Sequence, residues 1–124
     1  MEQVFRSFTV SLYNNSSESF EILDSSILMG QWAMGEEPKS GGRVMAGEVG
    51  GPWVNESVEE DMGAGAVVVL NGNKGEVVLH WMLTADGKCE MQLGQEHYQI
   101  SCERVDNIHH EDHRLWRFSI NDFQ

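Results

Sequence analysis

The run His-His-Glu-Asp-His at residues 109–113 is the densest cluster of groups that could do chemistry in this chain. His109 and His113 stand at positions i and i+4, a spacing that places two imidazoles on one face of a helix, where zinc or nickel would bind them. The glutamate is misplaced for the zinc-protease motif His-Glu-x-x-His. With His110, these histidines beside two acids would also gain charge at roughly pH 6. We favour a solvated loop before the last strand, with no bound metal or cofactor, and the metal and pH hypotheses stay open.

Cys89 and Cys102 are the two cysteines, and the strand pattern around them predicts how they face each other. If residues 94–97 form a four-residue hairpin loop closed by Leu93 and Tyr98, Cys89 lies opposite Cys102 on the apolar face. Opposed residues in an antiparallel pair have Cα atoms ~4.5–5.5 Å apart, so a disulfide is geometrically allowed. We favour two buried, reduced thiols. Neither cysteine is expected to be a nucleophile, because an apolar setting raises the pKa of a thiol.

Other motifs of catalysis are missing from the sequence. The acidic run at residues 55–61 lacks the alternating Asp/Asn pattern of an EF-hand calcium loop, so we interpret it as part of a solvated acidic loop at residues 55–65. No Gly-x-Ser-x-Gly, glycine-rich phosphate loop or Cys-x-x-Cys occurs. We therefore expect a protein that is not an enzyme. A metal-dependent enzyme built on His109–His113 is the less favoured alternative.

The chain holds four tryptophans, and their settings differ. Trp116 shares the alternation of the last strand, so we expect it in the core. Trp53 follows two glycines and a proline in a segment that indicates a loop, and a loop aromatic among polar residues is typical of lipid-headgroup or sugar contact. We predict a ligand-binding set of Trp53, Trp32, Asn55 and Trp81. The tryptophans would stack or insert at an interface, and Asn55 would supply hydrogen bonds.

The candidate residues above must be positioned by β-strands, which the sequence indicates by alternating apolar and polar residues. Residues 6–14 show it clearly, with apolar side chains on one face and Ser7, Thr9 and Ser11 on the other. Residues 66–70 and 76–83 flank Asn-Gly-Asn-Lys-Gly, a hairpin loop by its turn chemistry. Short connections predict antiparallel pairing, so we expect an all-β, single-domain antiparallel β-sandwich over residues 1–124. It would have about eight or nine short strands, at residues 6–14, 20–23, 26–34, 43–53, 66–70, 76–83, 89–93, 98–103 and 114–120.

Composition narrows the range of partners. Hydrophobic residues make up 40% of the chain, as in globular proteins, and 20 acids against 8 bases give a net charge of −12. Such a chain is repelled by nucleic acid and by anionic lipid surfaces, whereas neutral or zwitterionic lipids, sugars and proteins remain open. No apolar run approaches the ~20 residues of a membrane helix. The first residues do not have the pattern of a signal peptide, so we expect a cytoplasmic protein or one released without a signal peptide.

Part of the sequence resembles the aegerolysins, small acidic β-sandwich proteins of fungi and bacteria with haemolysin members. The likeness lies in a first strand that ends at Asn14, a short turn, a second strand, and then Gly30 and Trp32. Residues 62–70, Met-Gly-Ala-Gly-Ala-Val-Val-Val-Leu, lie where the family has a Gly-x-x-Gly before a strand, and Trp81 stands in the place of the tryptophan of the following strand. The family's Cys-Gly-Arg segment and its Trp-x-Cys-Pro-Trp run are missing. The resemblance implies reversible binding to a membrane component, sometimes with a partner protein that forms the pore.

These observations lead to one main functional hypothesis. We expect a non-enzymatic binding module that recognises a membrane lipid headgroup or a glycan, as part of a cytolytic, pore-forming system if the resemblance extends to activity. The alternative is a structural or protein–protein interaction module whose acidic surface meets a basic partner. In that case the tryptophans are mostly core residues.

Overall fold

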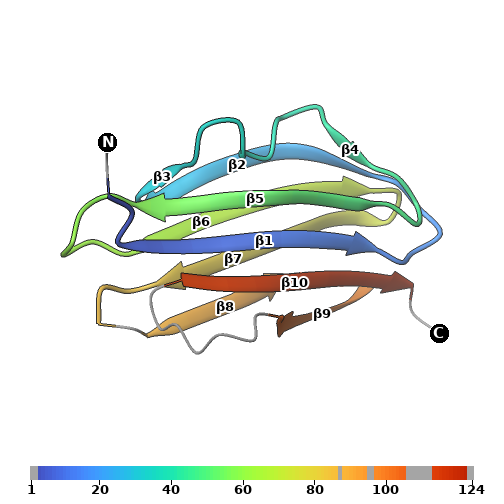
Figure 1. Cartoon of the computed structure of the whole chain (residues 1–124). Coiled ribbons are helices and arrows are strands. Elements are labelled where there is room, and N and C mark those ends of the chain that lie inside the picture. Colours follow the sequence, from blue (N-terminus) through green and yellow to red (C-terminus); the bar gives the residue numbers. More distant parts are fainter. Residues whose placement is uncertain (1–2, 87, 95–96, 106–112, 123–124) are drawn as a thin grey trace.

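The computed structural model describes residues 3–86, 88–94, 97–105 and 113–122 as two stacked β-sheets (Figure 1). The predicted single-domain β-sandwich is therefore confirmed as a fold class, with ten strands instead of eight or nine. No helix in the described part of the chain is long and apolar enough to cross a membrane. The strands are β1 Arg6–Asn14, β2 Phe20–Met29, β3 Gln31–Trp32, β4 Arg43–Val44, β5 Val49–Ser57, β6 Ala64–Gly72, β7 Gly75–Leu83, β8 Cys89–Gly94, β9 Tyr98–Arg104 and β10 His113–Asp122.

Each sheet has five strands and is named here by its central strand. The β1 sheet has the order β3-β5-β1-β10-β9, and the β6 sheet has the order β4-β2-β6-β7-β8. The chain crosses between them at Gly30, inside the segment that we had predicted as one strand over residues 26–34. Gly30 has a φ of +78°, and a Cβ there would collide with the carbonyl oxygen of Glu56. Only glycine accepts both conditions, so the strand breaks at this residue.

One strand pair contradicts the prediction of antiparallel pairing throughout. β1 and β10 are parallel, with Ser7 opposite His113 and Asn14 opposite Ile120. Short connections force antiparallel pairing only between strands that follow each other in the chain. β1 and β10 come from opposite ends of the sequence, so no short connection restricts their relative direction.

The predicted hairpin of Cys89 and Cys102 is wrong. β8 pairs with β7, where Leu83 lies opposite Cys89, and β9 pairs with β10, where Phe118 lies opposite Cys102. The alternation could not distinguish the two arrangements, because the apolar face of each strand meets the same core in either case. Both cysteines are free, half-buried and packed against that core.

Aromatic rings fill the centre of the sandwich. Trp81 is completely buried and stacks on Phe8, with ring centroids 5.6 Å apart and planes 9° apart. The ring of Phe118, from the facing sheet, lies 6.1 Å from that of Trp81, and Trp116 stacks on Phe8 with ring centroids 6.2 Å apart. Trp116 is thus a partly buried residue packed against the core, as expected. Aromatic side chains bury more area than any others, so this group is a major source of the stability of the fold.

The loops at the two ends are shorter than the sequence pattern indicates. The loop predicted at residues 71–75 reduces to Asn73 and Lys74, because β6 and β7 pair as far as Gly72 and Gly75. The acidic loop predicted at residues 55–65 reduces to residues 58–63. Arg6 anchors this second loop from inside: its guanidinium donates to the carbonyl oxygens of Glu60 and Met62 at 2.6 and 3.2 Å, and to that of Ala85, in the connection after β7, at 2.9 Å.

Candidate functional site

Trp53 does not lie on a loop, so the premise of its predicted role is wrong. It belongs to β5 and its side chain is only 6% exposed. The preceding Gly51 and Pro52 stand together opposite the single residue Ser11, which makes a β-bulge in a continuous strand. Gly51 has a φ of +87°, and a bulge is one of the few places where a strand tolerates proline. Glycine and proline therefore marked a bulge here instead of a loop.

The other three predicted ligand contacts do lie together, but inside the protein. Asn55 and Trp81 are both 0% exposed, and the Trp81 Nε1–H donates to Asn55 Oδ1 at 3.2 Å. Asn55 Nδ2 donates to the carbonyl oxygens of Met29 and Gln31 at 3.2 and 3.1 Å, on both sides of the Gly30 crossing. Trp32 is half-buried and packs edge-on against Trp81 at 6.0 Å. This arrangement holds the two sheets together and leaves Asn55 and Trp81 no surface for a ligand.

The histidine cluster lies largely outside the described residues. His109 and His110 fall there, and His113 is the one member that the structure describes. It is exposed at the start of β10, with its Nδ1 2.9 Å from the hydroxyl oxygen of Ser7. Among the described residues, no group of three or more His, Cys, Asp or Glu side chains could hold a metal ion. Neither the solvated loop that we expect at residues 109–113 nor the less favoured metal site is tested by the described residues.

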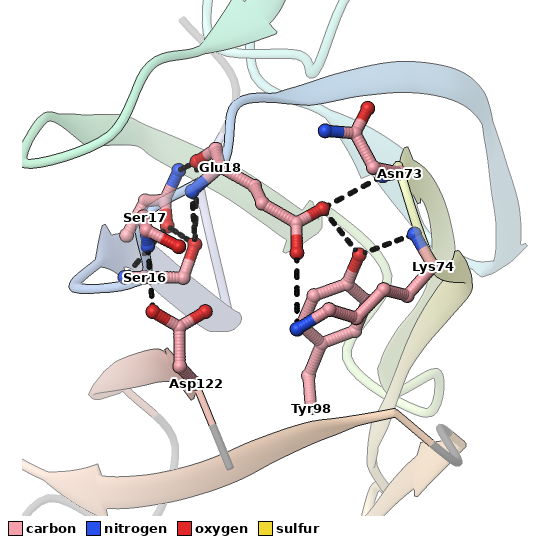
Figure 2. Close-up of polar contacts among 8 residues, drawn as sticks. Ser16, Ser17, Glu18, Asn73, Lys74, Tyr98 and Asp122 are labelled. Atoms are coloured by element: carbon pink, nitrogen blue, oxygen red, sulfur yellow. Dashed lines mark hydrogen bonds and ion pairs between the residues drawn. The ribbon is translucent and has the colours of Figure 1, made fainter. Parts of the chain in front are cut away.

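A second polar cluster ties the loop between β1 and β2 and the turn between β6 and β7 to the start of β9 (Figure 2). The buried Glu18 accepts hydrogen bonds at Oε1 from the Tyr98 hydroxyl and from the backbone N–H of Asn73, both at 2.8 Å. The Lys74 ammonium lies 3.4 Å from Glu18 Oε2, and the Lys74 N–H donates to the Tyr98 hydroxyl oxygen at 2.8 Å. Burial raises the pKa of Tyr98, and its hydrogen bond to Glu18 raises it further. Since these groups satisfy each other, we interpret the cluster as structural.

The outer face of the β1 sheet is the best candidate for a functional site. Alternation in β1 buries every second residue and turns Ser7, Thr9, Ser11 and Tyr13 outward. The strand register then places the outward residues of the neighbouring strands beside them. We call this surface the hydroxyl face; it comprises Ser7, Thr9, Ser11, Tyr13, Val54, Glu56, Gln99, Ser101, Glu103, His113, Leu115, Arg117, Ser119 and Asn121.

One fixed pair of charges lies within the hydroxyl face. The Arg117 guanidinium sits over the Tyr13 ring, 4.8 Å from its centroid, and forms an ion pair with Glu103. The hydrogen bond to Glu103, and then that to Tyr13, raises the pKa of Arg117 above its usual value. A guanidinium suits a phosphate, whereas an aromatic ring and a carboxylate suit a quaternary ammonium or an amine. Hydroxyl groups around them can donate or accept hydrogen bonds.

The outer face of the β6 sheet has different chemistry. Its central strands turn Val67, Val69, Val78, His80 and Met82 outward, with Ser26 and the carboxylates of Asp24 and Glu90 on the flanking strands. This half-buried, mostly apolar centre with an acidic edge carries fewer hydroxyl and amide groups than the hydroxyl face. The sequence pattern showed Ser7, Thr9 and Ser11 on one side of a strand, but the hydroxyl face could not be recognised without the parallel β1–β10 pairing that completes it.

We find no protein-family model and no curated protein that matches this chain. Solved structures that are similar to it include the following three. IP-1A from Alcaligenes faecalis superposes with a TM-score of 0.70 at 7% identity, over 97% of this chain and 93% of that one. The lipid binding protein Nakanori superposes with a TM-score of 0.75 at 7% identity, over 95% and 72%. RahU, in complex with a TRIS molecule, superposes with a TM-score of 0.73 at 10% identity, over 96% of each chain.

At such low identity these likenesses show the fold alone. Nakanori has an aegerolysin-type fold, so the resemblance inferred from the sequence is supported at the level of the fold. Membership of the family and its activities stay predictions.

Proposed function

We propose that this protein is a non-enzymatic binding module that recognises the headgroup of a neutral or zwitterionic membrane lipid through its hydroxyl face. The observation that carries the proposal is the contrast between the strongly negative charge of the whole chain and the small number of charged side chains on the hydroxyl face. The chain has a net charge of −12, yet eight of the fourteen side chains of the hydroxyl face end in a hydroxyl or amide group, and its acidic and basic side chains are limited to the Arg117–Glu103 ion pair, Glu56 and His113. A protein with this charge is repelled by anionic surfaces, and this face is where it can approach an uncharged one closely.

An apolar edge adjoins the hydroxyl face. Val49 lies opposite Tyr13 in the register and is 53% exposed. Met45, in the turn before β5, is 49% exposed. Apolar side chains beside a polar recognition surface suit the boundary between headgroups and acyl chains, where burial of apolar area adds to the hydrogen bonds. The lipid binding named for Nakanori is consistent with this proposal but is a property of that protein.

The test is co-sedimentation with vesicles of phosphatidylcholine, of sphingolipid with sterol, and of phosphatidylcholine mixed with an anionic lipid. We expect binding to one or both of the uncharged compositions and weaker binding when the anionic lipid is present. Each assay is repeated with EDTA, since binding that vanishes only with EDTA would overturn this proposal in favour of a metal site at the histidines. Absence of pelleting on every composition would refute the membrane proposal and favour the glycan.

Two isosteric positions provide a matched pair of variants. Thr9 is central on the hydroxyl face, between Val54 and Leu115, and Val67 is central on the outer face of the β6 sheet, between Ser26 and His80. Thr9→Glu should weaken binding at least about tenfold, because a bound headgroup would have to desolvate the new carboxylate. Val67→Glu carries the same added charge and should bind like the parent protein. Equal loss in both variants would contradict the assignment of the face.

A glycan is the second candidate, because the same hydroxyl and amide groups can bind sugar hydroxyls. A soluble oligosaccharide array, probed with the parent protein and both variants, separates the two. Binding to a sugar that Thr9→Glu abolishes, without any binding to uncharged vesicles, would replace the lipid by a glycan as the ligand of this face.

A further inference from the structure

Among the described residues, no strand or helix packs on the outer face of the β6 sheet. Every strand that the structure describes belongs to one of the two sheets, and the described residues form no helix. Since the two sheets stack on each other, this face lies on the opposite side of the molecule from the hydroxyl face (Figure 1). An apolar sheet face is normally covered by a further element, so this face is a candidate interaction surface.

Apolar side chains gather at the centre of this face. The register turns Val67 and Val69 of β6 outward, together with Val78 and Met82 of β7. Gly65, opposite Met82 in the register, has no side chain of its own, and the Met82 side chain lies against it. The apolar area is therefore continuous along β6.

Two β-bulges in β2 add one leucine each to the border of this area. The register between β2 and β6 skips Leu23 and Leu28. Each follows an isoleucine that packs in the core, so the leucine turns to the outer side, where it is 41% or 46% exposed. Strict alternation from the buried Ile22 would turn Leu28 inward, and the bulge redirects it outward. We call this surface the valine patch; it comprises Leu23, Leu28, Val67, Val69, Val78 and Met82.

Carboxylates border the valine patch on three sides. Glu21 and Glu76 turn outward at the end nearest the turn between β6 and β7. Asp24 lies on the β2 side and Glu90 on the β8 side, and both are exposed. Of the described residues, the register places one basic side chain on this face, that of Arg43 opposite Glu21. The border therefore attracts a positively charged partner.

The dimensions of the valine patch fit one helix. From Val78 to Met82 the strand rises by about 13 Å, which is the length of about nine helical residues. From β2 across β6 to β7 there are two strand spacings, or about 10 Å, which matches the diameter of a helix with its side chains. A helix with one apolar stripe therefore covers the patch, and its flanking residues meet the carboxylates.

Charge opposes other occupants of the valine patch. A second copy of this chain would bring the same carboxylates and its own net charge of −12 against the face. An anionic bilayer would be repelled, and an uncharged bilayer would have to desolvate the bordering carboxylates. A basic partner instead forms ion pairs with them.

We propose that the valine patch is the docking site of a positively charged amphipathic helix from a partner protein. The apolar stripe of the helix buries against the patch, and lysine or arginine side chains beside the stripe pair with Glu21, Asp24, Glu76 and Glu90. Because the valine patch and the hydroxyl face lie on opposite sides of the molecule, both can be occupied at once. The inference does not depend on lipid binding by the hydroxyl face.

The probe is a synthetic helical peptide of about fourteen residues, with leucines along one stripe and lysines elsewhere. It is titrated into the intact, isotope-labelled protein, and the NMR shifts of the backbone amides locate its binding surface. We expect saturable shifts on β2, β6 and β7. A second peptide, with glutamate in place of every lysine, should bind at least about tenfold more weakly.

Leu28 and Met34 provide a matched pair of variants, because both are exposed apolar side chains and Leu28 alone belongs to the valine patch. Leu28→Lys should weaken binding of the lysine peptide at least about fivefold, because it puts a positive charge beside the helix. Met34→Lys adds the same charge in the loop after β3 and should bind within about twofold of the parent protein. Val67→Lys, at the centre of the patch, should lose at least about tenfold.

Three results would overturn the proposal: no saturable binding of the lysine peptide, shifts on the hydroxyl face instead, or equal weakening in Leu28→Lys and Met34→Lys. Dimerisation of the parent protein that Leu28→Lys abolishes would replace the helix by a second copy. Pelleting with uncharged vesicles that Leu28→Lys abolishes and Thr9→Glu does not would make the patch a membrane surface. The mapping on the parent protein needs no substitution, so a variant that fails to fold leaves the test intact.

Discussion

Replacement of Asn55 by alanine should unfold the protein more readily instead of only weakening a binding site. Asn55 is completely buried and makes three hydrogen bonds, two to the backbone at the Gly30 crossing and one to the Trp81 indole. Asn55→Ala leaves the buried Nε1–H of Trp81 and two carbonyl groups without these partners. An unsatisfied buried polar group costs about 1–3 kcal/mol, and partial relaxation makes a total of about 3 kcal/mol reasonable.

Urea unfolding measures this loss directly. With a slope of about 1.5 kcal/mol per molar urea, a loss of about 3 kcal/mol lowers the unfolding midpoint by about 2 M. Trp81→Phe is the matched variant, because it removes the indole N–H and keeps an aromatic ring. Since both variants remove the same hydrogen bond, a double-mutant cycle should give a coupling energy of about 1 kcal/mol or more. A loss in Asn55→Ala below about 0.5 kcal/mol would refute the reasoning and would restore Asn55 as a candidate ligand contact.

Two further predictions concern buried polar groups at the two ends of the sandwich. Arg6→Met should lower the free energy of unfolding by about 2–4 kcal/mol, because three loop carbonyls lose a charged donor. Hydrogen exchange should then show faster opening of residues 58–63. An unchanged exchange rate there would contradict the anchoring role of Arg6. Stability should fall above about pH 9–10, because the thiols and Tyr98 have pKa values above their ordinary 9.0 and 10.0 in the folded state and stay protonated there while the unfolded chain ionises. Tyr98→Phe should remove part of this alkaline decline in a pH series of thermal melts, whereas an identical decline would show that Tyr98 does not contribute.

The alternation in the sequence predicted part of the candidate site correctly and part of it wrongly. The sequence placed Ser7, Thr9 and Ser11 on the outward side of one strand, and the structure agrees. It also selected Trp32, Asn55 and Trp81, which do lie together. The prediction that Asn55 and Trp81 contact a ligand assumed that they lie at the surface, and both are completely buried. Asparagine and tryptophan form hydrogen bonds and stacking contacts inside a protein as readily as with a ligand. Trp53 was misplaced because glycine and proline occur at bulges as well as in loops.

The sequence by itself determined the all-β class and most strand positions, because inward and outward residues alternate locally and this needs no knowledge of the partner strand. Only the tertiary structure decided which strands are neighbours. The parallel β1–β10 pair joins the two ends of the chain, and the separation of β8 from β9 puts Cys89 and Cys102 in different sheets. The predicted neighbours, antiparallel pairs and a β8–β9 hairpin, would bury the same apolar side chains as the observed ones. The packing of the whole core therefore decides which strands pair. For that reason the strands could be predicted from the sequence, whereas the hydroxyl face and the separation of the two cysteines into different sheets could not.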